Sequence, residues 1–145
     1  MSTFQTPKGS EGPVVFHRGV KYYVLAGTGC CACIGGSTIY VMMADTMKGP
    51  WTYAGDVGSK PGHTFDAHSP DNYVTKAQAS AVLEIATPGG EMQYLWMGNQ
   101  WNSGLSETPP GPRMHDLLYW TVLKFDNATG KVLQVPYEEE ITFDM

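Results

Sequence analysis

The stretch that decides the fold runs Glu11-Gly-Pro-Val-Val-Phe-His-Arg-Gly-Val-Lys-Tyr-Tyr-Val-Leu-Ala-Gly27, and a counterpart of it begins 67 residues later, at Gln78. The second half of this stretch returns as Tyr94-Leu-Trp-Met-Gly98, at an offset of 71 residues. A turn sequence, Asp45-Thr-Met-Lys-Gly49, returns as Asp126-Asn-Ala-Thr-Gly130 at an offset of 81 residues. Because the offset grows only between these elements, the insertions fall in loops. A repeat of about 65 to 80 residues that holds four short strands is typical of a propeller blade.

Alternating apolar residues bounded by Gly, Pro and Asp predict short strands, and no stretch has the spacing of an amphipathic helix. We therefore expect an all-β fold, a partial β-propeller of about two four-stranded antiparallel blades. The predicted strands are 14–18, 21–26, 37–44 and 51–54 in the first blade, then 79–85, 91–97, 117–125 and 131–137 in the second. A single domain over 1–145 would hold the first blade (11–55), a connector (56–76), the second blade (77–137) and a terminal strand (138–144).

Composition narrows the classes of partner. The 145 residues include 17 Gly and 10 Pro, which suits a turn-rich β protein, and the net charge is −5. No basic patch is present, so we expect no nucleic-acid partner. No apolar run approaches the roughly 18 residues needed to span a membrane. The first residues lack the charged-then-apolar plan of a signal peptide, and the sequence leaves the localisation open.

Two blades do not close a ring, because each blade buries its faces on its neighbours and propellers usually have at least about four. We therefore expect the chain to form part of a larger propeller. The missing blades could come from further sequence or from another copy of the chain in a homo-oligomer.

The cysteines Cys30, Cys31 and Cys33 stand close together in a glycine-rich loop. An odd number cannot pair completely within the chain. A zinc site would need a fourth ligand, for which His63 or His68 could be recruited, but the two CxxC halves of structural sites are absent. A local disulfide or small buried thiols are the favoured alternatives, and we expect no metal and no cofactor.

The run from Glu11 to Gly27 resembles the segment of glycoside hydrolase family 43 that carries the catalytic acid. Gly49-Pro-Trp-Thr52 is similar to an element that closes a blade in these enzymes. Three further motifs resemble the branch that contains exo-β-1,3-galactanases: Ala77-Gln-Ala-Ser80, Met97-Gly-Asn-Gln-Trp-Asn102 and Leu118-Tyr-Trp120. The resemblance implies the later blades of a five-bladed propeller with its active site on the central axis. It also implies a carbohydrate partner and hydrolysis, with inversion, of O-glycosidic bonds in a β-galactan or in arabinan or xylan side chains.

Glu11 and Gln78 each precede the first strand of a blade, so the two side chains should converge at the axis. Inverting hydrolysis needs an acid for the leaving oxygen and a base for water, with the two carboxyls roughly 6.5–9.5 Å apart. Glu11 is the candidate acid, although a solvated turn residue is the plainer interpretation. The family's usual Asp base and its second Asp lie on earlier blades, which this sequence starts too late to contain. Gln78 cannot take a proton as a carboxylate does. The resemblance implies that it orients the water, and a strand-capping amide is the alternative.

Further candidates for sugar contacts lie in the loops and at the strand ends. Trp101 offers a flat face for stacking, although its ring could equally plug the gap between the blades. Trp51, Trp96 and Trp120 lie within strand patterns and are predicted to be core. The candidate substrate-binding residues are Thr28, Asn99, Trp101, Asp116 and Tyr119.

Three hypotheses follow from the sequence. The chain is a fragment of a galactanase-like glycosidase, a non-catalytic carbohydrate-binding propeller module, or a half-propeller that assembles with a second copy.

Overall fold

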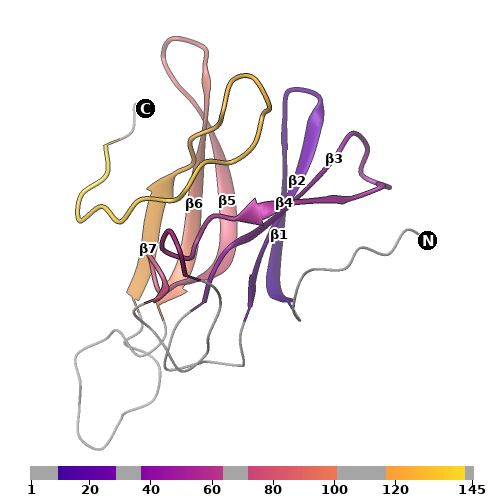
Figure 1. Cartoon of the computed structure of the whole chain (residues 1–145). Helices are drawn as coiled ribbons and strands as arrows, with labels where there is room; N and C mark the ends of the chain where they lie inside the picture. The colour runs from indigo at the N-terminus through magenta and orange to yellow at the C-terminus, as the bar shows by residue number, and fades with distance from the viewer. Residues whose placement is uncertain (1–9, 29–36, 64–71, 101–116, 143–145) are drawn as a thin grey trace, which may run out of the picture.

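The computed structural model describes residues 10–28, 37–63, 72–100 and 117–142, which form two antiparallel sheets (Figure 1). The predicted all-β fold is confirmed. The first sheet has the order β1-β2-β3-β4, and the second has the order β5-β6-β7. The strands are β1 (Ser10–Arg18), β2 (Lys21–Thr28), β3 (Tyr40–Ala44), β4 (Thr52–Asp56), β5 (Gln78–Ala86), β6 (Met92–Gln100) and β7 (Leu117–Val122). Within the described ranges, no helix is long and apolar enough to cross a membrane.

The predicted fourth strand of the second blade, 131–137, is wrong, and so is the described part of the terminal strand predicted over 138–144. After β7 the chain makes one isolated bridge, between Phe125 and Val132, and then leaves the sheet. The backbone N–H of Val135 donates to the carbonyl of Val57, the residue that follows β4, at 3.0 Å. The Gln134 amide nitrogen donates to the carbonyl of Val57 at 2.8 Å as well. This segment therefore ties the two units together instead of extending the second sheet.

The first strands of the two units, β1 and β5, lie against each other in the register of the sequence repeat. Near one end, the Gln78 amide donates to the Glu11 carboxylate at 3.2 Å. Near the other end, the backbone N–H of His17 donates to the Glu84 carboxylate at 3.5 Å. Both pairs are 67 residues apart. The offset in the sequence is thus also the spatial alignment of the two sheets.

Aromatic rings from both units form the core near the hairpin ends of these strands. Phe16 stacks on Tyr23, with ring centroids 4.8 Å apart and planes 7° from parallel. Tyr94, the counterpart of Tyr23, lies 5.3 Å from the same Phe16 ring. Phe125 meets Tyr23 edge-on at 5.7 Å, and the Arg18 guanidinium lies over its ring at 4.2 Å. These contacts bury aromatic area in offset and edge-to-face geometries, which stabilise the interface between the sheets.

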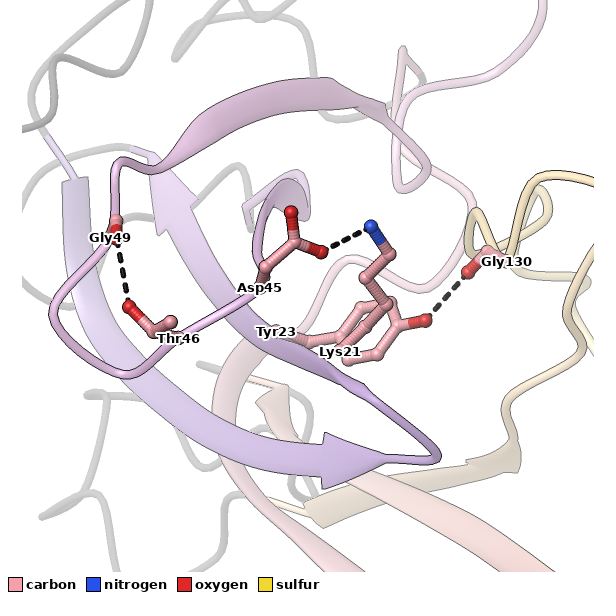
Figure 2. Close-up of polar contacts among 6 residues, drawn as sticks. All are labelled: Lys21, Tyr23, Asp45, Thr46, Gly49 and Gly130. Atoms are coloured by element: carbon pink, nitrogen blue, oxygen red, sulfur yellow. Dashed lines mark hydrogen bonds and ion pairs between the residues drawn. The ribbon is translucent and has the colours of Figure 1, made fainter.

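The two repeated turns lie at the hairpin end as well, and they are held differently (Figure 2). The Lys21 ammonium contacts the Asp45 carboxylate at 2.5 Å, and the Thr46 hydroxyl donates to the Gly49 carbonyl at 2.8 Å. The Tyr23 hydroxyl reaches from the first sheet to the carbonyl of Gly130 at 2.8 Å. The turn of the second unit is therefore anchored on the first.

Candidate active site

The candidate residues gather at the end of the sheets opposite the hairpins, the lower end in Figure 1, where β1, β5 and β7 start and β2 and β6 end. We call this the strand-start end. The register pairs Glu11 with Gly27 and Gln78 with Asn99, and Asn99 with Leu118. Antiparallel pairing therefore brings the predicted residues Glu11, Gln78 and Asn99 to one end of the fold.

A β-bulge follows each of the two equivalent positions. In β1 the register shifts between Glu11 and Val14, and in β5 it shifts between Ala79 and Ala81. Bulges re-aim side chains and are common next to active sites. Here they separate the regular ladders from the ends that carry Glu11 and Gln78.

The Glu11 and Gln78 side chains meet directly. The Gln78 Nε2 donates to the Glu11 Oε2 at 3.2 Å, and both residues are half-buried. The sequence predicted that these two positions converge, and the structure brings them into contact.

Three glycines enclose Gln78. The sequence analysis did not predict them as site residues. Gly12 has a φ of +57°, and a Cβ there would lie 2.6 Å from the carbonyl oxygen of Ala79 and 3.5 Å from the Gln78 Cγ. A Cβ on Gly27 would lie 3.3 Å from the Gln78 Cγ, and one on Gly98 would lie 2.9 Å from the Gln78 carbonyl oxygen. The signal was present, because Gly27 and Gly98 end the two repeated strand patterns. Their small size lets the strands close around Gln78.

The contact between Glu11 and Gln78 limits what the pair can do as it stands. In an inverting glycosidase the acid and the water lie on opposite faces of the sugar, with the carboxyls roughly 6.5–9.5 Å apart. Groups joined by a 3.2 Å hydrogen bond cannot hold a sugar between them. A ligand at this site must either separate the pair or approach both groups from one side.

Tyr119, a predicted sugar contact, is buried, and its hydroxyl serves the fold. The hydroxyl donates to the Pro136 carbonyl at 3.1 Å and accepts from the backbone N–H of Glu138 at 2.7 Å. Burial, more than the nearby Glu138 charge, raises the pKa of Tyr119. Its side chain holds the C-terminal segment, and the substrate contact stays a prediction that this geometry does not support.

The remaining predictions have mixed outcomes. Asn99 is half-buried beside Gln78 in register, whereas Trp96 is fully buried, as predicted for a core residue. Trp120 is 40% exposed on β7, the last strand of the second sheet, so its prediction as core is wrong. Several residues that the sequence analysis singled out lie outside the described part of the structure. They are Cys30, Cys31, Cys33, His68, Trp101 and Asp116, together with the side chain of Thr28. Within the described ranges, no group of three His, Cys, Asp or Glu residues is placed to hold a metal ion.

Comparison with solved structures supports the fold. No protein-family model and no curated protein matches the sequence. A β-1,3-galactosidase of glycoside hydrolase family 43, solved with galactodeoxynojirimycin, matches with a TM-score of 0.66 and 16% identity, over 92% of this chain and 32% of that chain. An exo-β-1,3-galactanase from Clostridium thermocellum matches with a TM-score of 0.60 and 16% identity, over 80% and 21% of the two chains. Another family 43 β-1,3-galactosidase matches with a TM-score of 0.60 and 17% identity, over 86% and 22%.

These similarities confirm, at the level of the fold, the resemblance to family 43 that the sequence motifs indicated. The chain has a glycoside hydrolase-like fold and is a partial propeller. It spans about a third or less of the length of these solved structures.

Proposed function

We propose that this chain contributes two blades to a glycosidase that cleaves O-glycosidic bonds of a β-galactan, with Glu11 as the general acid. The observation that carries the proposal is the contact of Glu11 with Gln78 at the strand-start end. It occurs in a fold similar to that of solved β-1,3-galactosidases, at the position where the sequence resembles the family's acid segment.

In the ligand-free chain the Gln78 amide holds the Glu11 carboxyl in place. The Gln78 Nε2 donates to the Glu11 Oε2 at 3.2 Å, and both groups lie at the strand-start end. Because this hydrogen bond must open before a sugar can accept a proton from Glu11, the contact positions the carboxyl in the resting state and takes no part in the proton transfer.

Gln78 is also our candidate for orienting the attacking water, and this role requires the pair to separate. A sugar that enters between the two side chains would break the 3.2 Å contact and leave the amide for water on the other face. The blades that complete the ring would supply the remaining groups.

Hydrolysis of β-1,3-galactan and of an aryl β-galactoside tests the proposal. General-acid catalysis is worth roughly 10²–10⁴-fold, and most for a poor leaving group. In the completed propeller, formed with further blades or by assembly, Glu11→Gln should therefore lose about that much activity on the polymer and partly keep activity on the aryl substrate. Glu84→Gln is the matched control, because the Glu84 carboxylate also accepts a hydrogen bond across β1 and β5, from the His17 backbone N–H. Equal polymer hydrolysis by Glu11→Gln and the parent would remove Glu11 from the mechanism.

A carbohydrate-binding module without catalysis is the second candidate, and the closed contact of the pair favours it. A carboxylate and an amide side by side can bind sugar hydroxyls from one side without any chemistry. Calorimetry with a galacto-oligosaccharide separates the two candidates: binding that survives Glu11→Gln, with no hydrolysis by the parent, would support the module.

A second copy of the chain is the partner we propose for completing the blades where no further sequence does so. Apolar side chains are exposed on the first strands, with Val15 49% and Leu83 45% exposed. Exposed apolar positions on sheet edges favour association. Sedimentation at micromolar concentration should show a dimer or larger species, and a monomer that melts cooperatively would contradict this arrangement.

A further inference from the structure

A separate cavity of about 510 Å³ lies at the strand-start end of the second sheet. Its walls come from the segment after β4, the segment that leads into β5, the end of β6 and the C-terminal segment. Lys76 of this wall and Gln78 of the candidate active site flank the fully buried Ala77. The lining residues that matter are Lys60, Tyr73, Thr75, Lys76, Gln100 and Tyr137.

Hydrogen bonds to backbone carbonyls hold the walls in place. The Gln100 side-chain Nε2 donates to the Thr75 carbonyl at 2.9 Å, which joins the end of β6 to the segment before β5. The backbone N–H of Lys60 donates to the Asn72 carbonyl at 2.7 Å. Lys76 has a φ of 52°, which is unusual for a residue with a side chain. Such backbone strain persists only where the surroundings impose it, and it is common at binding sites.

One residue of the cavity wall carries a buried hydroxyl without a partner among the described residues. Thr75 is 1% exposed, and its hydroxyl has no hydrogen-bond partner among the described residues. A buried hydroxyl without a partner is unfavourable, so nearly all of them are satisfied by protein, water or ligand. The exposed side chains of Lys60 and Lys76 bring two positive charges to the same wall. The chain carries a net charge of −5, so this positive wall stands out against an acidic protein.

An oriented aromatic ring stands at the same cavity. Tyr137 is 59% exposed, and its ring stacks on Tyr119 with centroids 5.5 Å apart and planes 16° from parallel. Tyr119 is fixed by its own hydrogen bonds to Pro136 and Glu138. The exposed ring is therefore held in orientation before any ligand arrives, which reduces the entropy lost on binding.

We propose that this cavity binds an acidic sugar, a hexuronate unit of the polysaccharide, with the carboxylate on Lys60 and the pyranose face on Tyr137. Lys60 has no ion-pair partner among the described residues, and a carboxylate supplies one. An aromatic face packs against the C–H face of a sugar, and the ring oxygens and hydroxyls can meet Thr75 and Gln100. The inference rests on the proposed carbohydrate function and adds a specificity site next to it.

Titration of the full chain with methyl β-D-galacturonide and with neutral methyl β-D-galactoside, followed by NMR, tests the proposal. The galacturonide should bind, shift the backbone signals of Lys60, Thr75 and Gln100, and bind at least about tenfold more tightly than the neutral sugar, since hydrogen bonds to charged groups are the strong ones. Lys60→Ala should weaken binding roughly ten- to a hundredfold, and Lys60→Arg should restore most of it. Tyr137→Ala should weaken it roughly two- to tenfold, while Tyr137→Phe keeps the ring.

Lys131→Ala is the matched control, because Lys131 is an exposed lysine beside the turn at the opposite end of the fold. Equal binding of the neutral galactoside would overturn the charge-based part of the proposal. If sulfate displaces the galacturonide and binds with equal affinity, and Tyr137→Ala has no effect, the cavity binds an adventitious anion only. Glu11→Gln should leave galacturonide binding unchanged. Absence of hydrolysis by the parent chain, with intact galacturonide binding, would therefore count against the proposed catalysis alone. Hydrolysis by the parent chain without galacturonide binding would count against this site alone.

Discussion

The two repeat units agree closely along their first two strands and differ at their outer edges. β1–β2 and β5–β6 share a bulge after the first residues, an aromatic residue at Tyr23 or Tyr94, and a closing glycine at Gly27 or Gly98. At the outer edge, β4 pairs with β3, whereas the segment after β7 leaves its sheet and bonds to Val57. The repeat is kept where the units face each other and form the candidate site. It is lost where the chain ties one unit to the other.

Substitutions in the core should have the largest effect on stability and test whether the two units are equivalent. Leu25 and Trp96 occupy equivalent positions, and both are fully buried. We expect Leu25→Ala to lower the free energy of unfolding by about 2–5 kcal/mol and Trp96→Ala by about 3–5 kcal/mol, because each leaves a cavity. Urea unfolding followed by circular dichroism measures both. A loss confined to one unit, with the other unit's signal unchanged, would show that the sheets fold independently and would break the comparison.

The closing glycines provide the next test. A Cβ on Gly98 would lie 2.5 Å from the Trp96 Cη2 and 2.9 Å from the Gln78 carbonyl oxygen, a ring and a backbone atom. A Cβ on Gly27 would meet the hydroxyl of Ser37, the end of a small side chain, which could move only by losing its hydrogen bond to the Thr38 carbonyl. We expect Gly98→Ala to destabilise by about 1–3 kcal/mol and Gly27→Ala by less.

Thermal melts of the two glycine variants measure this difference. Gly89→Ala is the control, since its Cβ would make only an ordinary contact, 3.7 Å from the Thr87 hydroxyl. Equal losses of stability for the two variants would contradict the predicted difference between the two glycines.

The equivalent residues Tyr23 and Tyr94 should differ by a smaller amount in their contribution to the free energy of unfolding. The Tyr23 hydroxyl donates to the Gly130 carbonyl at 2.8 Å, while burial, followed by the charge of Glu84, raises the pKa of Tyr94. Tyr23→Phe should lower the free energy of unfolding by about 1 kcal/mol, the usual net value of one hydrogen bond. Tyr94→Phe, which keeps the ring in the same cluster, should change it by much less. Equal losses for the two variants would contradict the role of Tyr23 as the anchor of the second turn.

The two repeated turns, at 45–49 and 126–130, should have the smallest effects on stability. One should depend on pH and the other on salt concentration. Side-chain and backbone hydrogen bonds from Thr129 lower the pKa of Asp126. Its contribution to stability is therefore present above the ordinary Asp pKa and is lost as the pH falls through the lowered value. The exposed Lys21–Asp45 pair should instead weaken as salt is added.

Stability curves against pH and against sodium chloride, for Thr129→Ala and Asp45→Asn, measure these effects. Thr129→Ala should reduce the acid-sensitive part and leave the salt dependence as it was. A change in salt dependence for Thr129→Ala, or none for Asp45→Asn, would contradict the assignment of the two turns.

The strands and the repeat could be predicted from the sequence because both are recorded locally. Alternation of apolar residues, together with Gly19 and the turn sequences, placed six of the seven observed strands within about three residues at each end. The exception is β1, which begins at Ser10 instead of 14. The repeat also paired Glu11 with Gln78, since equivalent positions in neighbouring blades have equivalent places in space.

Only the tertiary structure decided how those elements meet. The 3.2 Å separation of Glu11 and Gln78 depends on the bulges and on glycines from three strands, which approach one another only after the sheets pack. The segment 131–137 has a strand-like pattern, and its Leu133 N–H still donates to the Lys124 carbonyl. The Val135 N–H and the Gln134 side chain instead donate to Val57 of the first unit, because a donor bonds to whichever acceptor the packed chain brings near. The cavity beside Tyr137 likewise joins residues from four distant segments. The sequence by itself determined which residues form strands and which positions are equivalent, whereas the distances between side chains, and so the chemistry they permit, arose from packing.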